Sequence, residues 1–449
     1  MRRFFDGLQW DKVRFGHFPH RIEYAINEAG RWFMDSIRIQ GGIALQGKVR
    51  IQGSKNAALP ILAATLLCED NSFVRNCPRI ADVYSMVSLL KSLGCSIRWQ
   101  ETGIAVNSSR VHRAQMPRDA VKGMRSSLCL LGALIGRCSE VVMEHPGGCV
   151  IGERPIDLHL AALGRMGVEF EEDERYLKAF SHRLHGAAVS LPFPSVGATE
   201  NIILAGVMAD GDTVLEGAAR EPEVSALCVF LQQCGAWIEG TGSDRLIIHG
   251  GRRLYGTDFT VPADRIVAGT YLFGCIGAGG SVLLEQAPEE EMQAVLAVAV
   301  QMGGRVCSSE EGIYIQAPER PKAIELVTAP YPGFPTDLQS LVLAVETKGK
   351  GSSRIEERIF ENRFRIVEEL EKMGASVEVS DFRSALVHGV EMLRGARVEA
   401  KELRGGAALV VAGLMAEGET IVSGCPYIYR GYENIGRDFR ELGARVTSV

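Results

Sequence analysis

The sequence predicts an α/β protein built from six copies of one unit, and three observations support this fold class. First, a short phrase recurs six times at intervals of 68 to 73 residues: Leu, Met or Cys, then Gly, a small residue, any residue, and a β-branched or aromatic residue. Second, an amphipathic helical run precedes each glycine and a β-prone run follows it. Third, each copy contains one almost wholly apolar run. The repeated glycines are Gly94, Gly167, Gly235, Gly303, Gly374 and Gly443.

Each repeated glycine marks a point where we expect a helix to end and a strand to begin. Glycine adopts a positive φ without steric cost, so it is the usual residue at such a turn. A period of about 70 residues is too long for a solenoid repeat, and six open copies would leave exposed sheet edges. The period therefore predicts a compact βαβαββ-like unit that packs with its siblings around a centre.

The apolar runs predict one buried helix in each unit, because a helix that is apolar on all sides is buried on all sides. Only the first turn of each run is polar or charged, and we expect these ends to reach solvent and to converge. Helix N-termini attract anions through unpaired N–H groups and the helix dipole, so the convergence predicts a polar site for an anionic ligand. The residues at these ends are Lys55, Asn56, Arg125, Ser195, Asp264, Arg265, Asp337 and Arg404.

Length and composition indicate a large soluble enzyme. The chain has 449 residues, a net charge of −6 and a pI of about 5.9, which argues against a nucleic-acid or membrane-surface role. No apolar run approaches the roughly 20 residues that a membrane span needs. Six units divide naturally into two lobes of three, each large enough to bury a core of its own.

The eleven cysteines are odd in number, scattered, and free of a C-x-x-C motif. This usage suits reduced thiols in a cytoplasmic protein better than disulfides or a metal site. The sequence also lacks an H-E-x-x-H motif, and we interpret the acidic run 289–291 as a solvated face. We therefore expect no bound metal.

Cys149 has a different setting from the other cysteines. It follows the segment Pro-Gly-Gly at 146–148 and precedes Arg154 and Pro155, in a loop longer than its equivalents in the other units. A cysteine on a glycine loop near an arginine and a helix start is placed for a perturbed pKa and for reaction with a bound ligand. The alternative is a buried cysteine in a tight turn, and we favour the reactive thiol. Cysteines within apolar runs are interpreted as inert, for example Cys129, Cys228 and Cys275.

The first 33 residues lie outside the repeat and lack the apolar run of a signal peptide. The first repeat-like strand begins at Met34. We interpret residues 1–33 as a disordered extension or a mispredicted start.

Seven motifs occur together and in one order along the chain. They are GSKNAALP at 53–60, PGGCVIGERPIDLH at 146–159, REPE at 220–223, PADRI at 262–266, FPTDLQ at 334–339, FENRF at 360–364 and YRGYE at 429–433. With these motifs the chain resembles the UDP-N-acetylglucosamine enolpyruvyl transferase family from about residue 34 to its end. The resemblance implies the enolpyruvyl transferase fold, two inside-out α/β barrels of three units each. One lobe would span 55–262, the other 34–54 plus 263–449, with the active site between them.

The resemblance also implies a reaction. The enolpyruvyl group of phosphoenolpyruvate would move to the 3-hydroxyl of UDP-N-acetylglucosamine with release of phosphate, the first committed step of peptidoglycan synthesis. Cys149 matches the proton donor, which can also carry a covalent phosphoenolpyruvate adduct, and Asp337 matches the base that faces the sugar hydroxyl. Without the resemblance, Asp337 is better interpreted as an ordinary helix N-cap. No cofactor is implied, and the partners are the two small-molecule substrates.

Binding positions follow from the same resemblance. Phosphoenolpyruvate carries a phosphate and a carboxylate, so its site needs several fixed cations. The phosphoenolpyruvate positions are Lys55, Asn56, Arg154 and Arg430, with Arg404 in support. The nucleotide-sugar positions are Arg125, Arg154, Pro155, Ile156, Asp157, Leu158, Phe193, Pro194, Ser195, Val196, Asp337 and Ile359.

Two positions depart from the family pattern. Phe193 stands where the family usually carries a lysine, and Ala81 where a second basic residue often follows the pair at 78–79. Three alternatives stay open. The first is a paralogue that uses a modified sugar nucleotide. The second is a 5-enolpyruvylshikimate-3-phosphate synthase, and the third is a pseudoenzyme that binds a sugar nucleotide. The cysteine loop argues against the second, because those synthases lack it.

Overall fold

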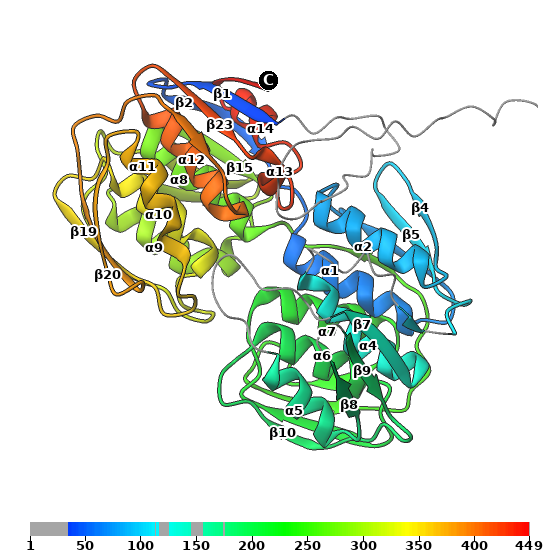
Figure 1. The fold of residues 1–449 in the computed structure, drawn as a ribbon. Helices are drawn as coiled ribbons and strands as arrows, with labels where there is room; N and C mark the ends of the chain where they lie inside the picture. Colours follow the sequence, from blue (N-terminus) through cyan, green and yellow to red (C-terminus); the bar gives the residue numbers. More distant parts are fainter. Residues whose placement is uncertain (1–34, 113, 116–124, 145–155, 174–175, 449) are drawn as a thin grey trace, which may run out of the picture.

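The computed structural model describes residues 35–112, 114–115, 125–144, 156–173 and 176–448, arranged in two bodies (Figure 1). The proposed extension at 1–33 lies outside these residues. Buried apolar side chains form two separate clusters. One contains residues between 57 and 261, and the other contains residues 37–51 together with 266–446. We call the bodies around them the inner lobe and the outer lobe. The lobe boundaries that we propose, at 54/55 and 262/263, fall between the two clusters.

The described residues form six four-stranded sheets that share one strand order. In every sheet an edge strand pairs in parallel with the second strand, which is antiparallel to the third, which is antiparallel to the fourth. The inner-lobe sheets are β14 (Asp258–Thr260), β3 (Asn71–Arg75), β5 (Gly103–Asn107) and β4 (Ser96–Trp99); β6 (Ala114–Gln115), β7 (Glu140–Glu144), β9 (Tyr176–Phe180) and β8 (Glu169–Glu172); and β10 (Ala188–Ser190), β11 (Asp212–Glu216), β13 (Arg245–His249) and β12 (Trp237–Glu239).

The outer lobe repeats this order three more times. Its sheets are β2 (Leu45–Arg50), β15 (Gly280–Glu285), β17 (Gly312–Gln316) and β16 (Arg305–Ser309); β18 (Glu325–Val327), β19 (Ser352–Glu356), β21 (Ser384–His388) and β20 (Ser376–Ser380); and β22 (Arg397–Glu399), β23 (Glu419–Ser423), β1 (Ser36–Gln40) and β24 (Arg445–Ser448). The prediction of six βαβαββ-like copies is confirmed.

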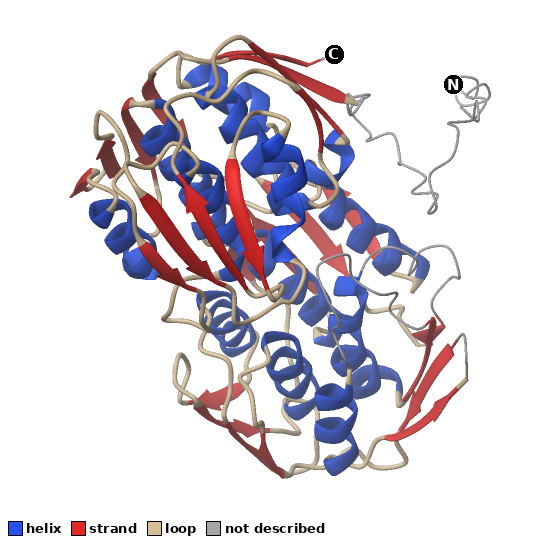
Figure 2. Cartoon of the chain, turned by 60° about the vertical axis from the view of Figure 1, so that its left-hand side comes forward, coloured by secondary structure: helices blue, strands red, loops and turns tan. Residues whose placement is uncertain are grey.

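One buried helix per unit lies inside its lobe, with the sheets on the outside (Figure 2). These helices are α1 (Lys55–Ala64), α4 (Leu130–Cys138) after the 3-10 turn η2 (Arg125–Cys129), α6 (Val196–Gly206), α8 (Arg265–Ala278), α10 (Gln339–Glu346) after η4 (Thr336–Leu338), and α12 (Leu403–Met415). The expectation that all their N-termini reach solvent is wrong. Asp264, Arg265 and Arg404 are buried, because each binds an oppositely charged or N–H partner at the junction of the lobes.

A second helix in each unit ends at the repeated glycine. These helices are α2 (Ala81–Ser92), α5 (Asp157–Arg165), α7 (Pro222–Gln233), α9 (Gln293–Gln301) after η3 (Glu289–Met292), α11 (Val367–Glu371) after η5 (Arg363–Ile366), and α14 (Ile435–Glu441). All six glycines have φ between 86° and 105°. The predicted role of these glycines in turning a helix into a strand is confirmed.

The chain crosses between the lobes twice, and the two crossings run side by side. Gly53 and Ala263 form an antiparallel bridge, and the N–H of Ser54 donates to the Pro262 carbonyl over 2.8 Å. A Cβ at Gly53 would lie 1.8 Å from the carbonyl oxygen of Asn76, so only glycine fits there. The paired crossings start α1 and α8 next to each other at the junction.

Candidate active site at the junction of the lobes

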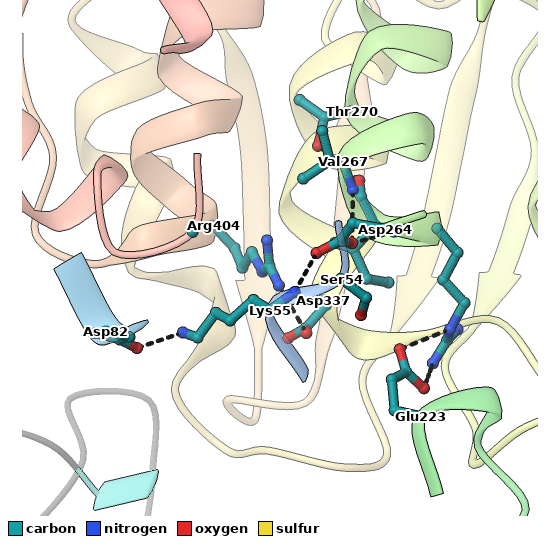
Figure 3. Close-up of polar contacts among 12 residues, drawn as sticks. Ser54, Lys55, Asp82, Glu223, Asp264, Val267, Thr270, Asp337 and Arg404 are labelled. Atoms are coloured by element: carbon teal, nitrogen blue, oxygen red, sulfur yellow. Dashed lines mark hydrogen bonds and ion pairs between the residues drawn. The ribbon is translucent and has the colours of Figure 1, made fainter. Parts of the chain in front are cut away.

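Asp264 joins the first turns of two buried helices, one from each lobe (Figure 3). As the N-cap of α8 it accepts hydrogen bonds from the N–H groups of Ile266 and Val267 over 2.8 and 3.1 Å. Its other oxygen accepts the N–H of Lys55, the first residue of α1, over 3.1 Å. Burial raises the pKa of Asp264. This carboxyl group therefore fixes where Lys55 enters the junction.

Lys55, Asp82 and Arg430 form a cluster that spans the two lobes; we call it the Asp82 cluster. Lys55 Nζ lies 2.6 Å from one Asp82 oxygen, and Arg430 Nε donates to the other over 2.8 Å. Asp82 lies in the first turn of α2 in the inner lobe, whereas Arg430 follows the short helix α13 (Cys425–Ile428) of the outer lobe. Burial alone would raise the pKa of Asp82, but the two cations lower it to about 2. Burial lowers the pKa of Lys55.

Asp337, Arg363 and Arg404 form a second cluster, which belongs wholly to the outer lobe; we call it the Asp337 cluster. Arg363 donates to one Asp337 oxygen over 2.8 Å and Arg404 donates to the other over 3.1 Å. Both arginine side chains are buried. The N-cap interpretation of Asp337 is wrong, because Pro335 is the N-cap of η4 and the Asp337 carboxylate binds arginines instead.

The two clusters are neighbours. The positive charges of Arg404, from one cluster, and Arg430, from the other, both lower the pKa of Lys55 further. Figure 3 shows Lys55, Arg404 and Asp337 lying close together, below Asp264 at the start of α8. Asn56, the next residue of α1, is half-buried in the same turn. The structure thus places Lys55, Asn56, Asp337, Arg404 and Arg430 in one region.

The segment around Ile359 is tied to the turn that carries Asp337. The buried carboxylate of Glu357 accepts hydrogen bonds from the hydroxyl of Thr336, over 2.9 Å, and from the N–H of Ile359, over 2.7 Å. Thr336 directly precedes Asp337, so Ile359 and Asp337 are held a short way apart on the outer lobe.

Other positions that we predict for the nucleotide sugar lie together on the inner lobe. Ile156–Leu158 begin α5, and Ser195 is the N-cap of α6, accepting the N–H of Ala198 over 3.4 Å. The two helix starts touch, because a Cβ at Gly197 would lie 3.0 Å from Cε1 of His159. Pro194 and Val196 are half-buried, and Phe193 is 45% exposed. A side chain at position 193 is therefore free to reach a ligand.

Some predicted residues fall beyond what the structure describes. Cys149, Arg154 and Pro155 lie outside the described residues, and of Arg125 only the backbone, at the start of η2, is described. Their positions in the site stay predictions.

Sequence reasoning missed several charged residues of the junction. The sequence predicts no role for Asp82, and it contains Glu223 and Arg363 only as members of the REPE and FENRF motifs. Arg265 of α8 donates to both oxygens of Glu223 of α7, over 3.1 and 3.2 Å, in a second ion pair between the lobes. The interpretation of 289–291 as a solvated face is wrong for Glu291, which is half-buried; burial and the nearby Glu223 raise its pKa to about 7.

The described ranges offer neither a metal site nor a helix that could span a membrane. They contain no group of three or more His, Cys, Asp or Glu side chains arranged to hold a metal ion. No helix among them has the length and apolar character needed to cross a membrane.

Comparisons with known proteins point to one family. The sequence matches the EPSP synthase (3-phosphoshikimate 1-carboxyvinyltransferase) family over residues 39–439. It is 43% identical to UDP-N-acetylglucosamine 1-carboxyvinyltransferase 2 of Caldanaerobacter subterraneus subsp. tengcongensis, covering 93% of this chain and all of that protein. It is 42% identical to UDP-N-acetylglucosamine 1-carboxyvinyltransferase of Methylacidiphilum infernorum, covering 93% of this chain and 99% of that protein.

Solved structures share the fold. The enolpyruvyl transferase NikO from Streptomyces tendae superimposes with a TM-score of 0.82 at 24% identity, covering 92% of this chain and 98% of that one. EPSP synthase from Acinetobacter baumannii does so with a TM-score of 0.74 at 19% identity, covering 92% and 100%. The expected inside-out two-lobed fold is confirmed.

Proposed function

Because the chain belongs to the enolpyruvyl transferase family and, within it, to the UDP-N-acetylglucosamine 1-carboxyvinyltransferases, we propose how its residues carry out that reaction. The enzyme transfers the enolpyruvyl group of phosphoenolpyruvate to the 3-hydroxyl of UDP-N-acetylglucosamine and releases phosphate, a step of peptidoglycan synthesis. We place it in the cytoplasm, where it supports cell shape and division. It uses no cofactor.

One observation carries the proposal: two carboxylates at the junction are each held between two cations. Asp82 lies between Lys55 and Arg430, and Asp337 lies between Arg363 and Arg404. Such cations have further N–H groups to offer a ligand, and arginine binds phosphate and carboxylate groups in bidentate geometry. Phosphoenolpyruvate carries one group of each kind, which supports its binding between the two clusters.

In this proposal Lys55 and Arg430 turn from Asp82 to the phosphate, and Arg404 turns from Asp337 to the substrate carboxylate. One oxygen of Asp337 then becomes available to the 3-hydroxyl of the sugar. Cys149 protonates the methylene carbon of phosphoenolpyruvate, the sugar oxygen attacks the adjacent carbon, and Asp337 takes the hydroxyl proton. Loss of a proton and of phosphate from the tetrahedral intermediate restores the double bond in the product.

Nucleotide-sugar recognition is proposed for the two helix starts of the inner lobe. The free N–H groups at the start of α6, which follow the cap Ser195, are suited to an anionic diphosphate. Ile156–Leu158 and Phe193–Val196 would line this end of the nucleotide, and Ile359 would contact it from the outer lobe. Arg125, Arg154 and Pro155 are proposed here on the resemblance alone.

The acceptor decides between the family's reactions. Phosphate release from phosphoenolpyruvate should require UDP-N-acetylglucosamine and should not occur with shikimate 3-phosphate. Release with shikimate 3-phosphate alone would make the chain a 5-enolpyruvylshikimate-3-phosphate synthase. A clear preference for a modified sugar nucleotide would favour the paralogue, and no release with any acceptor would favour the pseudoenzyme.

The role of the thiol has its own test. Cys149→Ser should nearly abolish turnover and leave nucleotide-sugar binding intact, whereas Cys149→Asp should retain activity, since a carboxylic acid also delivers a proton. The epoxide antibiotic fosfomycin should alkylate Cys149 in the wild-type enzyme. Full activity of the serine variant, or alkylation of a different cysteine, would contradict the assignment.

A further inference from the structure

Two cysteines of the inner lobe are in contact although they are far apart in the sequence. The Sγ atoms of Cys68 and Cys234 lie 3.6 Å apart across 166 residues of chain, and both side chains are buried. The ten described cysteines are all free thiols, and no second pair among them has its sulfur atoms in hydrogen-bond contact. This pair therefore differs from the inert packing that the sequence suggested for the scattered cysteines.

The pair lies at the far ends of two neighbouring helices. Cys68 follows α1 and the 3-10 turn η1 (Thr65–Leu67), and Cys234 is the C-cap of α7, directly before the repeated Gly235. Helices α1 and α7 pack against each other (Figure 1). Their opposite ends carry Lys55 and Glu223 at the junction, so the thiol pair is separated from the candidate site by the length of both helices.

The chemistry of the pair is asymmetric. Hydrogen bonding with Cys234 lowers the pKa of Cys68, whereas the same bond and burial raise the pKa of Cys234. A thiolate is the nucleophile in thiol–disulfide exchange, so Cys68 is the attacking sulfur. Glu69 and Gly235, the next residues in sequence, are exposed, so a small reagent would reach the sulfurs through local opening at these two helix ends.

We propose that Cys68 and Cys234 are a site of reversible oxidation, which forms a disulfide between the C-terminal ends of α1 and α7. The oxidant is a low-molecular-weight disulfide of the glutathione class. Cys68 attacks one of its sulfurs and releases a first thiol; Cys234 then attacks the mixed disulfide at Cys68 and releases a second. The pair loses two electrons and two protons, and the external disulfide is reduced to two thiols.

The bond would close a loop that contains most of the inner lobe. Closing a long loop removes conformational freedom from the unfolded chain and so stabilises the folded state. The sulfurs must approach from contact distance to a bond of about 2.05 Å. Side-chain rotation and a small shift of the two helix ends would bring them together. We expect the inner lobe to become more resistant to unfolding on oxidation, with no new group at the junction.

The test uses the full chain with oxidised glutathione as the probe. We expect a peptide that joins Cys68 to Cys234 and is lighter by about 2 Da than the two free peptides together, and a higher melting temperature that excess reduced thiol reverses. Cys234→Ser should instead carry glutathione on Cys68. Cys228→Ser, which removes a buried cysteine from the same helix, should form the cross-link like the wild type.

The exposed Cys307 reports whether the reagent has acted. If Cys307 becomes glutathionylated while Cys68 and Cys234 are both recovered as free thiols after denaturation, the proposal is wrong. A cross-link of either cysteine to a different partner also overturns it. Should Cys234→Ser fold poorly, Cys68→Ser and Cys234→Ala give the same readout, since each must lose the joined peptide.

Discussion

The Asp82 and Asp337 clusters use the same chemistry in different mechanical settings. In each, one carboxylate lies between two cations. The Asp82 cluster takes its members from both lobes, whereas the Asp337 cluster lies entirely on the outer lobe. Any change in the angle between the lobes must therefore alter the first cluster and leave the second intact. The Asp82 cluster therefore responds to the position of the lobes, whereas the Asp337 cluster keeps its carboxylate in place.

The largest expected effect comes from the cluster that lies within one lobe. Asp337→Asn keeps the shape of the side chain but removes the carboxylate that we propose as the base, so kcat should fall by about 10²- to 10⁴-fold. Binding of UDP-N-acetylglucosamine, measured by calorimetry, should change far less. Because the buried Arg363 and Arg404 lose the half-buried anion that they bind, the melting temperature must be measured alongside. A variant with near-normal kcat would remove Asp337 from the chemistry.

A smaller effect is expected from the cluster that joins the lobes. Arg430→Ala removes a cation that we assign to phosphoenolpyruvate, and a hydrogen bond to a charged group is worth about 1.5–3 kcal/mol. The KM for phosphoenolpyruvate should therefore rise roughly 10- to 100-fold. Arg437→Ala, which removes an arginine of α14 that pairs with Asp438 within the outer lobe, is the matched control and should leave this KM unchanged. An unaltered KM in Arg430→Ala would separate the Asp82 cluster from substrate binding.

The smallest expected effect is on the pH dependence of the unfolding free energy. It distinguishes Glu346, a buried carboxyl group whose pKa is set by burial and a serine, from Asp82, which lies between two cations. Glu346, at the end of α10, is buried beside Ser353, and burial raises its pKa to about 7. Protonation of Glu346 therefore stabilises the folded state. This contribution is fully present below the pKa of the unfolded chain, near 4.3, and is lost as the pH rises through 7. Unfolding free energy should fall from pH 5 to 8, and Glu346→Gln should reduce that fall by roughly 2 kcal/mol.

Asp82 supplies the contrast in the same titration. Its pKa of about 2 keeps it ionised from pH 5 to 8, so Asp82→Asn should leave the slope over this interval unchanged. Denaturant unfolding at several pH values measures both slopes. If the two variants alter the slope equally, the cations around Asp82 do not protect its charge in the way that the structure indicates.

Local patterns predicted the fold because each depends on neighbouring residues. The six glycines need only a positive φ at the end of a helix, and the apolar runs need only burial, so both were visible in the sequence. The partners of the charged residues were not visible. Asp82 meets Arg430 only because the two crossings at Gly53 and Ala263 bring the lobes together, and nothing near Asp82 in the sequence signals that meeting.

The same reason explains the interpretation of Asp337. A residue at a helix start with a carboxylate side chain fits the pattern of an N-cap, and local sequence offers no contrary sign. The arginines that donate hydrogen bonds to its oxygens come from η5 and α12, two elements that approach each other only in the folded lobe. The FENRF motif contained Arg363, so the family resemblance held a signal that the repeat pattern did not.

The strand order also sets the sequence in which the lobes can be completed during synthesis. Strand β1 lies between β23 and β24, so this strand, the first among the described residues, waits for the last two. Every strand of the inner lobe lies between Asn71 and Thr260, so that lobe has all its pairing partners while the outer lobe is still being translated. A chain released early would thus carry an inner lobe with its described strands paired and an unpaired β1, whose open edges are exposed to pairing with another chain.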